Sequence, residues 1–398
     1  MAYAGIISGV RTSQNINTAN QRPDILKVLA LLEPYQTPFL QFLFFSNKPS
    51  IPVQNKQGTF SWFEDEYFPH QTTTTAAITA AGSPKTLGLT TSNCANVSIF
   101  NLNDLVYIEE TDETAFVSAV SAGVSATLTA VDGVSDLTST ASTTGYLKKF
   151  GSLNSENNST PTAMSTKEIQ KTNYLNILLE SVANTGRDQA GLAYTDGTTH
   201  AEQVQKKMKE MKVQAERLFI YSKLAGTKVS GGVLTTYGQG LLGRLSTNVT
   251  SYTGTPTETG VDTFISNVAA KGTGKKIFLM GSTLHNNFQQ IIKAKLGAIP
   301  NSYVTSYGVR VTEYMHGQAL VKVTWDPMLD GKFTNSGFLI DEGYIKARHM
   351  ANDLKGSRKF RIEPNVETPG TDRKETKLLA DIGVQIENEE VHGYFYKA

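Results

Sequence analysis

The clearest hydrophobic pattern in the chain lies between residues 199 and 226. Small or apolar residues recur there at alternating spacings of three and four, which predicts a single helix with a narrow buried stripe. Thr199 and Glu202 have the spacing of a capping box, and Gly226 is a residue type that ends helices. We expect a rod of about 39 Å that lies across a sheet or another subunit. A coiled coil is the disfavoured alternative, because the pattern stops before four heptads.

A second apolar stretch covers residues 39–45, where aromatic and aliphatic side chains follow one another closely. Before it we expect a polar extended arm over residues 1–22 and a short helix over residues 24–33. A free monomer could not leave such a stretch in water. It is either an ordinary core segment or a surface that another subunit covers. The side chains concerned include Phe39, Leu40, Phe42 and Phe44.

Residues 58–68 nearly alternate between aromatic and polar residues, and small residues follow over 72–82. This pattern predicts a long hairpin with a small-residue return strand. Three consecutive carboxylates, Glu64, Asp65 and Glu66, lie on its first strand. Adjacent side chains on a strand point to opposite faces, so we interpret them as a solvated edge and not as a metal or acid–base cluster.

Residues 86–160 are rich in Thr, Ser, Ala, Val and Gly, with a turn signal about every ten residues. This composition predicts a small all-β module inserted into a larger chain. Its expected strands cover residues 102–109, 115–120, 126–131 and 146–150. An extended run over 174–182 then leads through a polar turn at 184–188 into the long helix.

The rest of the chain alternates between helical and strand patterns, which indicates a mixed α/β region. We expect a half-exposed strand near the end, because Ile382, Val384 and Ile386 alternate with polar residues. The other expected elements are helices over 263–270 and 282–296, a buried strand over 276–280, and strands over 309–314, 320–325, 337–340 and 344–347.

Composition narrows the function classes. A length of 398 residues predicts two or three domains, and 37 basic against 36 acidic residues leave no global field to hold nucleic acid or an anionic membrane. Cys94 is the single cysteine, so we expect no disulfide framework and synthesis in a reducing cytoplasm. The chain shows neither a signal-peptide pattern nor an apolar run of about 18 residues, so we expect neither secretion nor a membrane span.

Candidate chemistry is sparse, and we expect neither an enzyme nor a cofactor or metal. Residues 272–276 suggest a phosphate loop, but Lys276 stands where Ser or Thr should hold magnesium, so a basic surface turn is favoured. The histidines lack metal-ligand spacing, and a dyad at Cys94 is disfavoured. The basic group Lys355, Arg358, Lys359 and Arg361 could contact phosphates, although a solvated face or a subunit contact is more usual.

The order of these parts resembles the major capsid proteins of tailed bacteriophages with the Hong Kong 97-type fold, in the branch with a small inserted β-domain. Residues 32–40, LEPYQTPFL, resemble the amino-terminal signature, and Trp62 with its acidic neighbours resembles the first strand of the extended loop. Residues 103–145 resemble the inserted module. Further likenesses cover residues 203–226 (spine helix), 276–280 and 282–296 (axial strand and helix), 318–349 (paired strands) and 374–393 (closing strand).

The resemblance implies an α+β fold of the Hong Kong 97 type with a small all-β insertion. The implied parts are an N-terminal arm with a short helix (1–50), an extended hairpin loop (51–85), the inserted β-domain (86–160), a peripheral domain with the spine helix at 199–226 (161–234), an axial α/β domain (235–350) and return strands of the peripheral domain (351–398).

The resemblance also implies a function: self-assembly into hexamers and pentamers of an icosahedral head around double-stranded DNA. Implied partners are other copies, with scaffold, portal and decoration proteins possible and no membrane; the place is the virion, assembled in the host cytoplasm. A tail or decoration protein, a cytosolic α/β enzyme and a surface β-rich binding protein are the alternatives. The expected inter-subunit contacts are Phe39, Leu40, Phe42, Phe44, Trp62, Phe63, Tyr67 and Phe68.

Overall fold

The computed structural model describes residues 37–45, 49–141, 143–156, 160, 162–191, 199–296, 302–304, 310–317 and 319–398. The arm expected over 1–22 and the helix expected over 24–33 lie outside these residues. The chain divides into two compact units, one of Met1–Trp62 with Thr172–Ala398 and the other of Phe63–Lys171. It passes from one to the other along β2 (Thr59–Glu64) and β10 (Ile169–Tyr174), which pair with each other.

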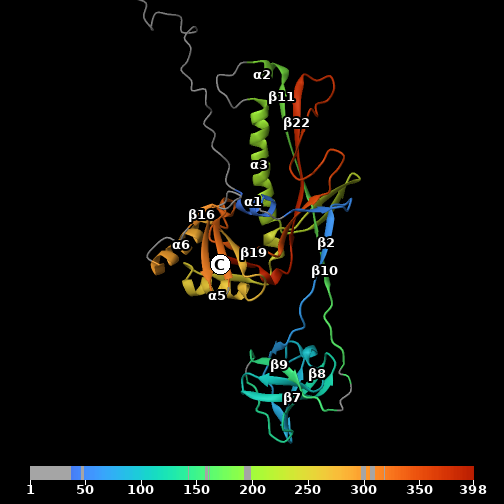
Figure 1. The fold of residues 1–398 in the computed structure, drawn as a ribbon, viewed down its shortest axis with the longest axis vertical. Coiled ribbons are helices and arrows are strands. Elements are labelled where there is room, and N and C mark those ends of the chain that lie inside the picture. Colours follow the sequence, from blue (N-terminus) through green and yellow to red (C-terminus); the bar gives the residue numbers. More distant parts are fainter. Residues whose placement is uncertain are drawn as a thin grey trace, which may run out of the picture. The chain divides into compact units, whose positions relative to one another are not determined.

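The long helix of the first unit is α3 (His200–Tyr221), and its predicted start is confirmed (Figure 1). The Thr199 side chain accepts from the Glu202 amide and Glu202 reaches back, forming the predicted capping box. The predicted end at Gly226 is wrong, because the helix stops at Ser222. There the Ser222 hydroxyl donates to the Gly238 carbonyl, and the Gly240 amide donates to the Ser222 carbonyl. The returning chain thus takes up the groups that a longer helix would use.

Between these residues the chain forms the hairpin of β12 (Gly226–Ser230) and β13 (Val233–Tyr237). The short helices of this unit are α1 (Pro38–Phe45), α2 (Gly186–Ala190) and α4 (Leu241–Arg244). Where a polar turn was expected at 184–188, α2 begins, because the Thr185 side chain accepts from the Asp188 amide and caps it.

Helix α3 lies along a sheet whose order is β1-β20-β22-β11, with β21 also paired to β22 (Figure 1). The strands are β1 (Ile51–Val53), β11 (Asn176–Thr185), β20 (Ile345–Met350), β21 (Arg361–Pro364) and β22 (Arg373–Ile386). Apolar residues on α3, β11 and β22 share one core cluster, among them Met211, Phe219, Leu178 and Val384. The extended run predicted over 174–182 is thereby confirmed.

The prediction that the last long strand is half exposed is wrong. Ile382, Val384 and Ile386 face the main core, but the polar residues between them are covered as well, with Gln385 2% exposed. Strand β22 lies between β11 and β20. On its other face, a Cβ added at Gly383 would meet Leu175 at 3.0 Å and Phe60 at 3.1 Å. The alternation therefore marks two buried faces of different polarity.

The hairpin predicted over 58–82 is also wrong, because β2 pairs with β10 from far along the chain. The small residues join the second unit, where β3 (Gln71–Thr73) pairs with β9 (Tyr146–Ser152) and β4 (Ala80–Gly82) with β5 (Lys85–Thr90). Thr72 is buried there, and its hydroxyl accepts from the Asn96 amide at 2.9 Å. A threonine-rich strand carries little information about which partner strand it meets.

The second unit forms a sheet of order β3-β9-β6-β7-β8-β5-β4, so the expected small all-β module is confirmed. Its remaining elements are β6 (Asp104–Ile108), β7 (Glu113–Ser121), β8 (Ser125–Ala130) and the 3-10 turn η2 (Val97–Ile99). Alternate residues such as Val106, Ile108, Val117 and Leu128 fill its core. These strands agree with the predicted ones to within a few residues.

The mixed α/β region of the first unit is built on a sheet of order β14-β23-β19-β15-β18-β17-β16. Phe264 of α5 and Leu284 and Phe288 of α6 pack with β15 in one core cluster. The predicted strands and helices are confirmed, except that α5 begins earlier, at Glu258 behind the Thr257 cap. The elements are α5 (Glu258–Ala269), α6 (Ser282–Leu296), β14 (Val249–Tyr252), β15 (Lys275–Met280), β16 (Ser302–Val304), β17 (Arg310–His316), β18 (Ala319–Trp325), β19 (Gly337–Asp341), β23 (Gly393–Lys397), η3 (Pro327–Leu329) and η4 (Glu389–Val391).

Candidate assembly surfaces

The aromatic stretch at residues 39–45 forms helix α1, which the chain itself covers. Phe39 and Leu40 are fully buried, and Phe42 and Phe44 are 6% and 4% exposed. The Phe44 ring stacks on Phe219 of α3 with centroids 6.1 Å apart. The core interpretation is confirmed, so these four expected contact residues offer almost no surface to a neighbour in this conformation.

A buried carboxylate fixes α1 to α3. The first amides of a helix lack partners inside the helix, and here Glu216 of α3 accepts from two of them. Its Oε1 lies 2.9 Å from the Phe39 nitrogen and its Oε2 lies 2.5 Å from the Leu40 nitrogen. Glu216 is 0% exposed. It therefore acts as the helix cap from a position far away in sequence.

Glu216 shares its buried site with Asp326, which caps η3 by accepting from the Met328 amide at 2.9 Å. Burial raises the pKa of Glu216 well above its usual value, and the neighbouring Asp326 charge raises it further. Burial raises the pKa of Asp326 to about 7. The hydrogen bond between the two carboxyl groups requires a shared proton, so this pair links α1, α3 and η3 through one protonated site.

The other expected contacts separate into covered and exposed side chains. Trp62 is 9% exposed and belongs to a small core cluster with Phe60 and Leu175. Phe68 is half-buried against the β-module core. Phe63 and Tyr67 are 70% and 101% exposed. We call residues 63–67 the acidic aromatic segment, since these two rings flank Glu64, Asp65 and Glu66.

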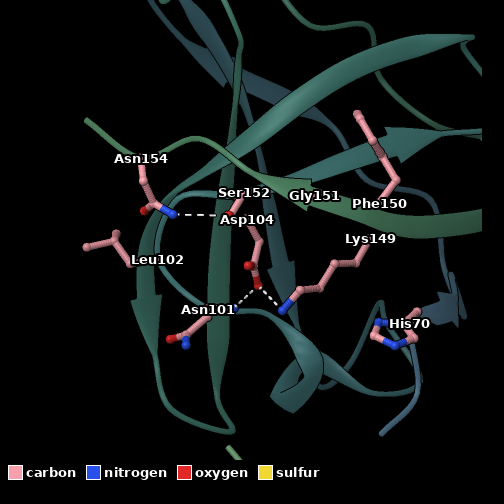
Figure 2. A pocket seen from close by; sticks show the side chains of 9 residues that line it. All are labelled: His70, Asn101, Leu102, Asp104, Lys149, Phe150, Gly151, Ser152 and Asn154. Carbon is pink, nitrogen blue, oxygen red and sulfur yellow. Dashed lines mark hydrogen bonds and ion pairs between the residues drawn. The ribbon is translucent and has the colours of Figure 1, made fainter. Parts of the chain in front are cut away.

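The β-module has a cavity of about 700 Å³ whose floor is an ion pair (Figure 2). Lys149 Nζ lies 2.6 Å from Asp104 Oδ2, which also accepts from the Asn101 amide at 2.5 Å. At the rim, Asn154 donates to Ser152 at 3.0 Å, and His70 lies apart from the ion pair (Figure 2). The polar groups at the floor bind one another, so they stabilise the module and form no catalytic arrangement.

Lys276 of the suspected phosphate loop is fully buried, so the surface-turn prediction is wrong for this residue. Its Nζ lies 2.8 Å from Asp341 Oδ2 on the neighbouring strand and also donates to the carbonyl of Val391. Burial lowers the pKa of Lys276. Although burial favours the protonated acid, hydrogen bonds from Lys276 and Thr273 keep the pKa of Asp341 below its usual value. This pair is a structural link inside the α/β sheet.

Sites for other chemistry are missing from the part of the chain that the structure describes. Its described residues contain no group of three His, Cys, Asp or Glu side chains that could hold a metal ion. None of the described helices combines the length and apolar character that a membrane span requires. What the surface does offer is the pair of exposed rings in the acidic aromatic segment.

Comparison with known proteins assigns the class of protein. The family model described as SU10 major capsid protein matches residues 11–397, nearly the whole chain, which defines a shell-forming structural protein. The chain belongs to the SU10 major capsid protein family. The prediction of a phage major capsid protein that associates with itself in the virion is thereby confirmed, and the α+β fold class agrees with the structure.

Solved capsid and encapsulin structures are similar to this chain at low identity. A chain of Mycobacterium phage Bobi is 9% identical with a TM-score of 0.47, covering 97% of this chain and 98% of that chain. A chain of Mycobacterium phage Ogopogo is 10% identical with a TM-score of 0.47, covering 98% and 100%. The SrpI encapsulin of Synechococcus elongatus PCC 7942 is 12% identical with a TM-score of 0.45, covering 58% and 77%. No curated protein matches the chain.

Proposed function

We propose that the chain assembles into hexamers and pentamers that tile the icosahedral head of a tailed bacteriophage around double-stranded DNA. The observation that carries this proposal is the major capsid protein match over residues 11–397. A formal net charge of +1 suits a wall that must neither grip packaged DNA tightly nor repel its own copies. The proposal includes assembly in the host cytoplasm, a purely structural and non-enzymatic role, and scaffold, portal and decoration proteins as partners.

Within this proposal, Phe63 and Tyr67 form contacts between subunits. Their exposure, 70% and 101%, is unusual for large rings, and covering them would remove apolar area from water. Many such contacts, each weak, allow misplaced subunits to dissociate and anneal. The division into arm, extended loop, peripheral and axial domains stays a prediction at the bounds given above.

The experiment that tests this function is negative-stain electron microscopy combined with light scattering on the purified, concentrated chain. Shells, tubes or rings with five- or six-fold symmetry are the expected products. A chain that stays a monodisperse monomer across the concentration range, with and without double-stranded DNA, would contradict assembly by this protein alone.

A further inference from the structure

A pocket of about 410 Å³ lies in the first unit between α3 and the chain that leads into β21. Its lining combines apolar and cationic groups, and the described lining holds no acidic residue. This volume is in the range of roughly 300–1,000 Å³ that binding pockets occupy. The lining residues are Met208, Lys212, Ser357, Lys359 and Phe360. We call it the α3 pocket.

The ammonium group of Lys359 is held in place by the end of α1. Its Nζ donates to the Phe44 carbonyl at 3.1 Å and lies 5.0 Å from the centroid of the Phe44 ring. Burial lowers the pKa of Lys359, so its positive charge is held where water solvates it poorly. A negative group bound in the pocket would stabilise that charge.

The aromatic wall of the pocket has a strained backbone. Phe360 has a φ of 88°, a conformation that an aromatic residue rarely adopts. Its ring packs edge-on against Phe44, with centroids 5.9 Å apart and planes at 80°. Strain of this kind costs about 1–3 kcal/mol and is concentrated at binding sites. Here it holds the ring beside the two lysines.

The pocket therefore suits a ligand that offers an apolar or aromatic group together with carboxylates. The acidic aromatic segment has this chemistry, with the Phe63 and Tyr67 rings beside Glu64, Asp65 and Glu66. Phe63 and Tyr67 are too exposed to be occupying the pocket of their own chain. A DNA phosphate would match the lysines but would leave Met208 and Phe360 without an apolar partner.

We propose that the acidic aromatic segment of one copy docks in the α3 pocket of a neighbouring copy. One ring packs against Met208 and Phe360, and carboxylates lie beside Lys212 and Lys359. This inference rests on the proposed function, since it needs neighbouring copies, and it adds the surface that receives Phe63 and Tyr67. Complementary charge of this kind favours the correct partner and fixes the register of docking.

The test uses full-length chain in two forms, one labelled with ¹⁵N and one unlabelled, mixed before assembly. A carbodiimide then joins lysines to carboxylates that are in contact, and mass spectrometry of the digest identifies the linked peptides. The expected product links Lys212 or Lys359 to residues 64–66 as mixed heavy–light pairs, which only contact between copies can give.

Variants make the test specific. Lys359→Met keeps the length of the side chain but removes its charge, and we expect about a tenfold or greater loss of the mixed link, as for close interfacial charge pairs. Lys206→Met, on the exposed part of α3, is the matched control and should leave the link unchanged. Should Lys359→Met prove unstable, reversing charges in trans, with Lys359→Glu in one copy and Asp65→Lys in the other, should recover assembly.

The outcomes separate the inference from the proposed function. Shells in which the lysines link to residues 64–66 only within one chain, or not at all, would overturn the inference and leave the function intact. Mixed links in small oligomers that never become shells would support the docking and contradict the function. Shells of Lys359→Met that form normally but retain less DNA would assign the pocket to phosphate and overturn the inference.

Discussion

Helix α1 and the acidic aromatic segment are both short and rich in aromatic residues, yet the structure treats them in opposite ways. Phe39 of α1 is fully buried by its own chain, whereas Phe63 is 70% exposed. Sequence alone made both of them candidates for contact with another subunit. The comparison shows that aromatic density predicts burial without telling which molecule provides the cover.

Charge explains the difference. The α1 sequence, PFLQFLFF, has no ionisable side chain, and its two leading amides are satisfied by Glu216. It can enter a dry core without losing a hydrated charge. The acidic aromatic segment carries Glu64, Asp65 and Glu66 between its rings, and unpaired carboxylates are costly to desolvate. Such a segment can be covered only by a surface that also supplies cations.

The largest effect is expected from a matched pair of phenylalanine substitutions. Phe39→Ala should lower the free energy of unfolding by about 3–5 kcal/mol, because it leaves a cavity in the core. Phe63→Ala should change it by less than about 0.5 kcal/mol, as for other surface sites. Denaturant unfolding of the unassembled chain measures both. Equal effects at the two positions would show that the segments do not differ in burial.

The next effect concerns the cap of α1. Glu216→Ala removes the acceptor of the Phe39 and Leu40 amides, and we expect a loss of about 2–4 kcal/mol in unfolding free energy, since each unsatisfied buried donor costs about 1–3 kcal/mol. Glu216→Gln retains an acceptor oxygen and should lose less. If the alanine and glutamine variants unfold alike, the carboxylate is not the cap that docks α1.

The buried carboxyl pair predicts a pH dependence of stability. Burial raises the pKa of Asp326 from 3.8 to about 7, so the folded chain holds a proton that the unfolded chain releases. The contribution is fully present below the unfolded pKa and is lost as the pH rises through about 7, with a slope of up to about 1.4 kcal/mol per pH unit. Denaturant titrations between pH 4 and 8 measure it.

Asp326→Asn removes one of the two titrating groups while retaining an acceptor oxygen, so its stability should depend less on pH across that range. Asp330→Asn, which changes an exposed carboxylate nearby, should retain the wild-type slope. A wild-type chain whose stability is flat or rises between pH 4 and 7 would show that the pair does not share a proton.

The smallest effect on stability is expected where the effect on assembly is large. The double substitution Phe63→Ser, Tyr67→Ser should leave the unfolding free energy within about 0.5 kcal/mol of wild type. Light scattering should nevertheless show a higher concentration threshold for assembly, because the exposed rings no longer lose water on contact. Unchanged assembly would exclude the acidic aromatic segment as an inter-subunit contact.

Local signals in the sequence predicted a large part of the fold. The capping box at Thr199, the apolar period of α3 and the alternation of the module strands each involve residues close together in the chain, and the structure confirms them. The partner of β2 was missed because β10 lies more than 100 residues away in the numbering. The burial of Gln385 was missed because it depends on packing at the second face of β22.

The candidate site was predicted only in part for the same reason. Phe63 and Tyr67 stand out in the sequence, but Trp62 next to them is covered by Phe60 and Leu175, and no local pattern separates them. The cap that Glu216 gives to α1 joins residues 177 positions apart. The α3 pocket likewise combines α3 with the chain before β21, so neither stretch alone indicates it.

Hydroxyl-radical footprinting of the unassembled chain and of assembled shells tests the central claim most directly, because it reports the solvent contact of each aromatic ring in both states. The account predicts that Phe63 and Tyr67 react in the unassembled chain and become protected in shells, while Phe39 and Phe44 stay unreactive in both. Reactive Phe39 and Phe44 that become protected only on assembly would contradict it.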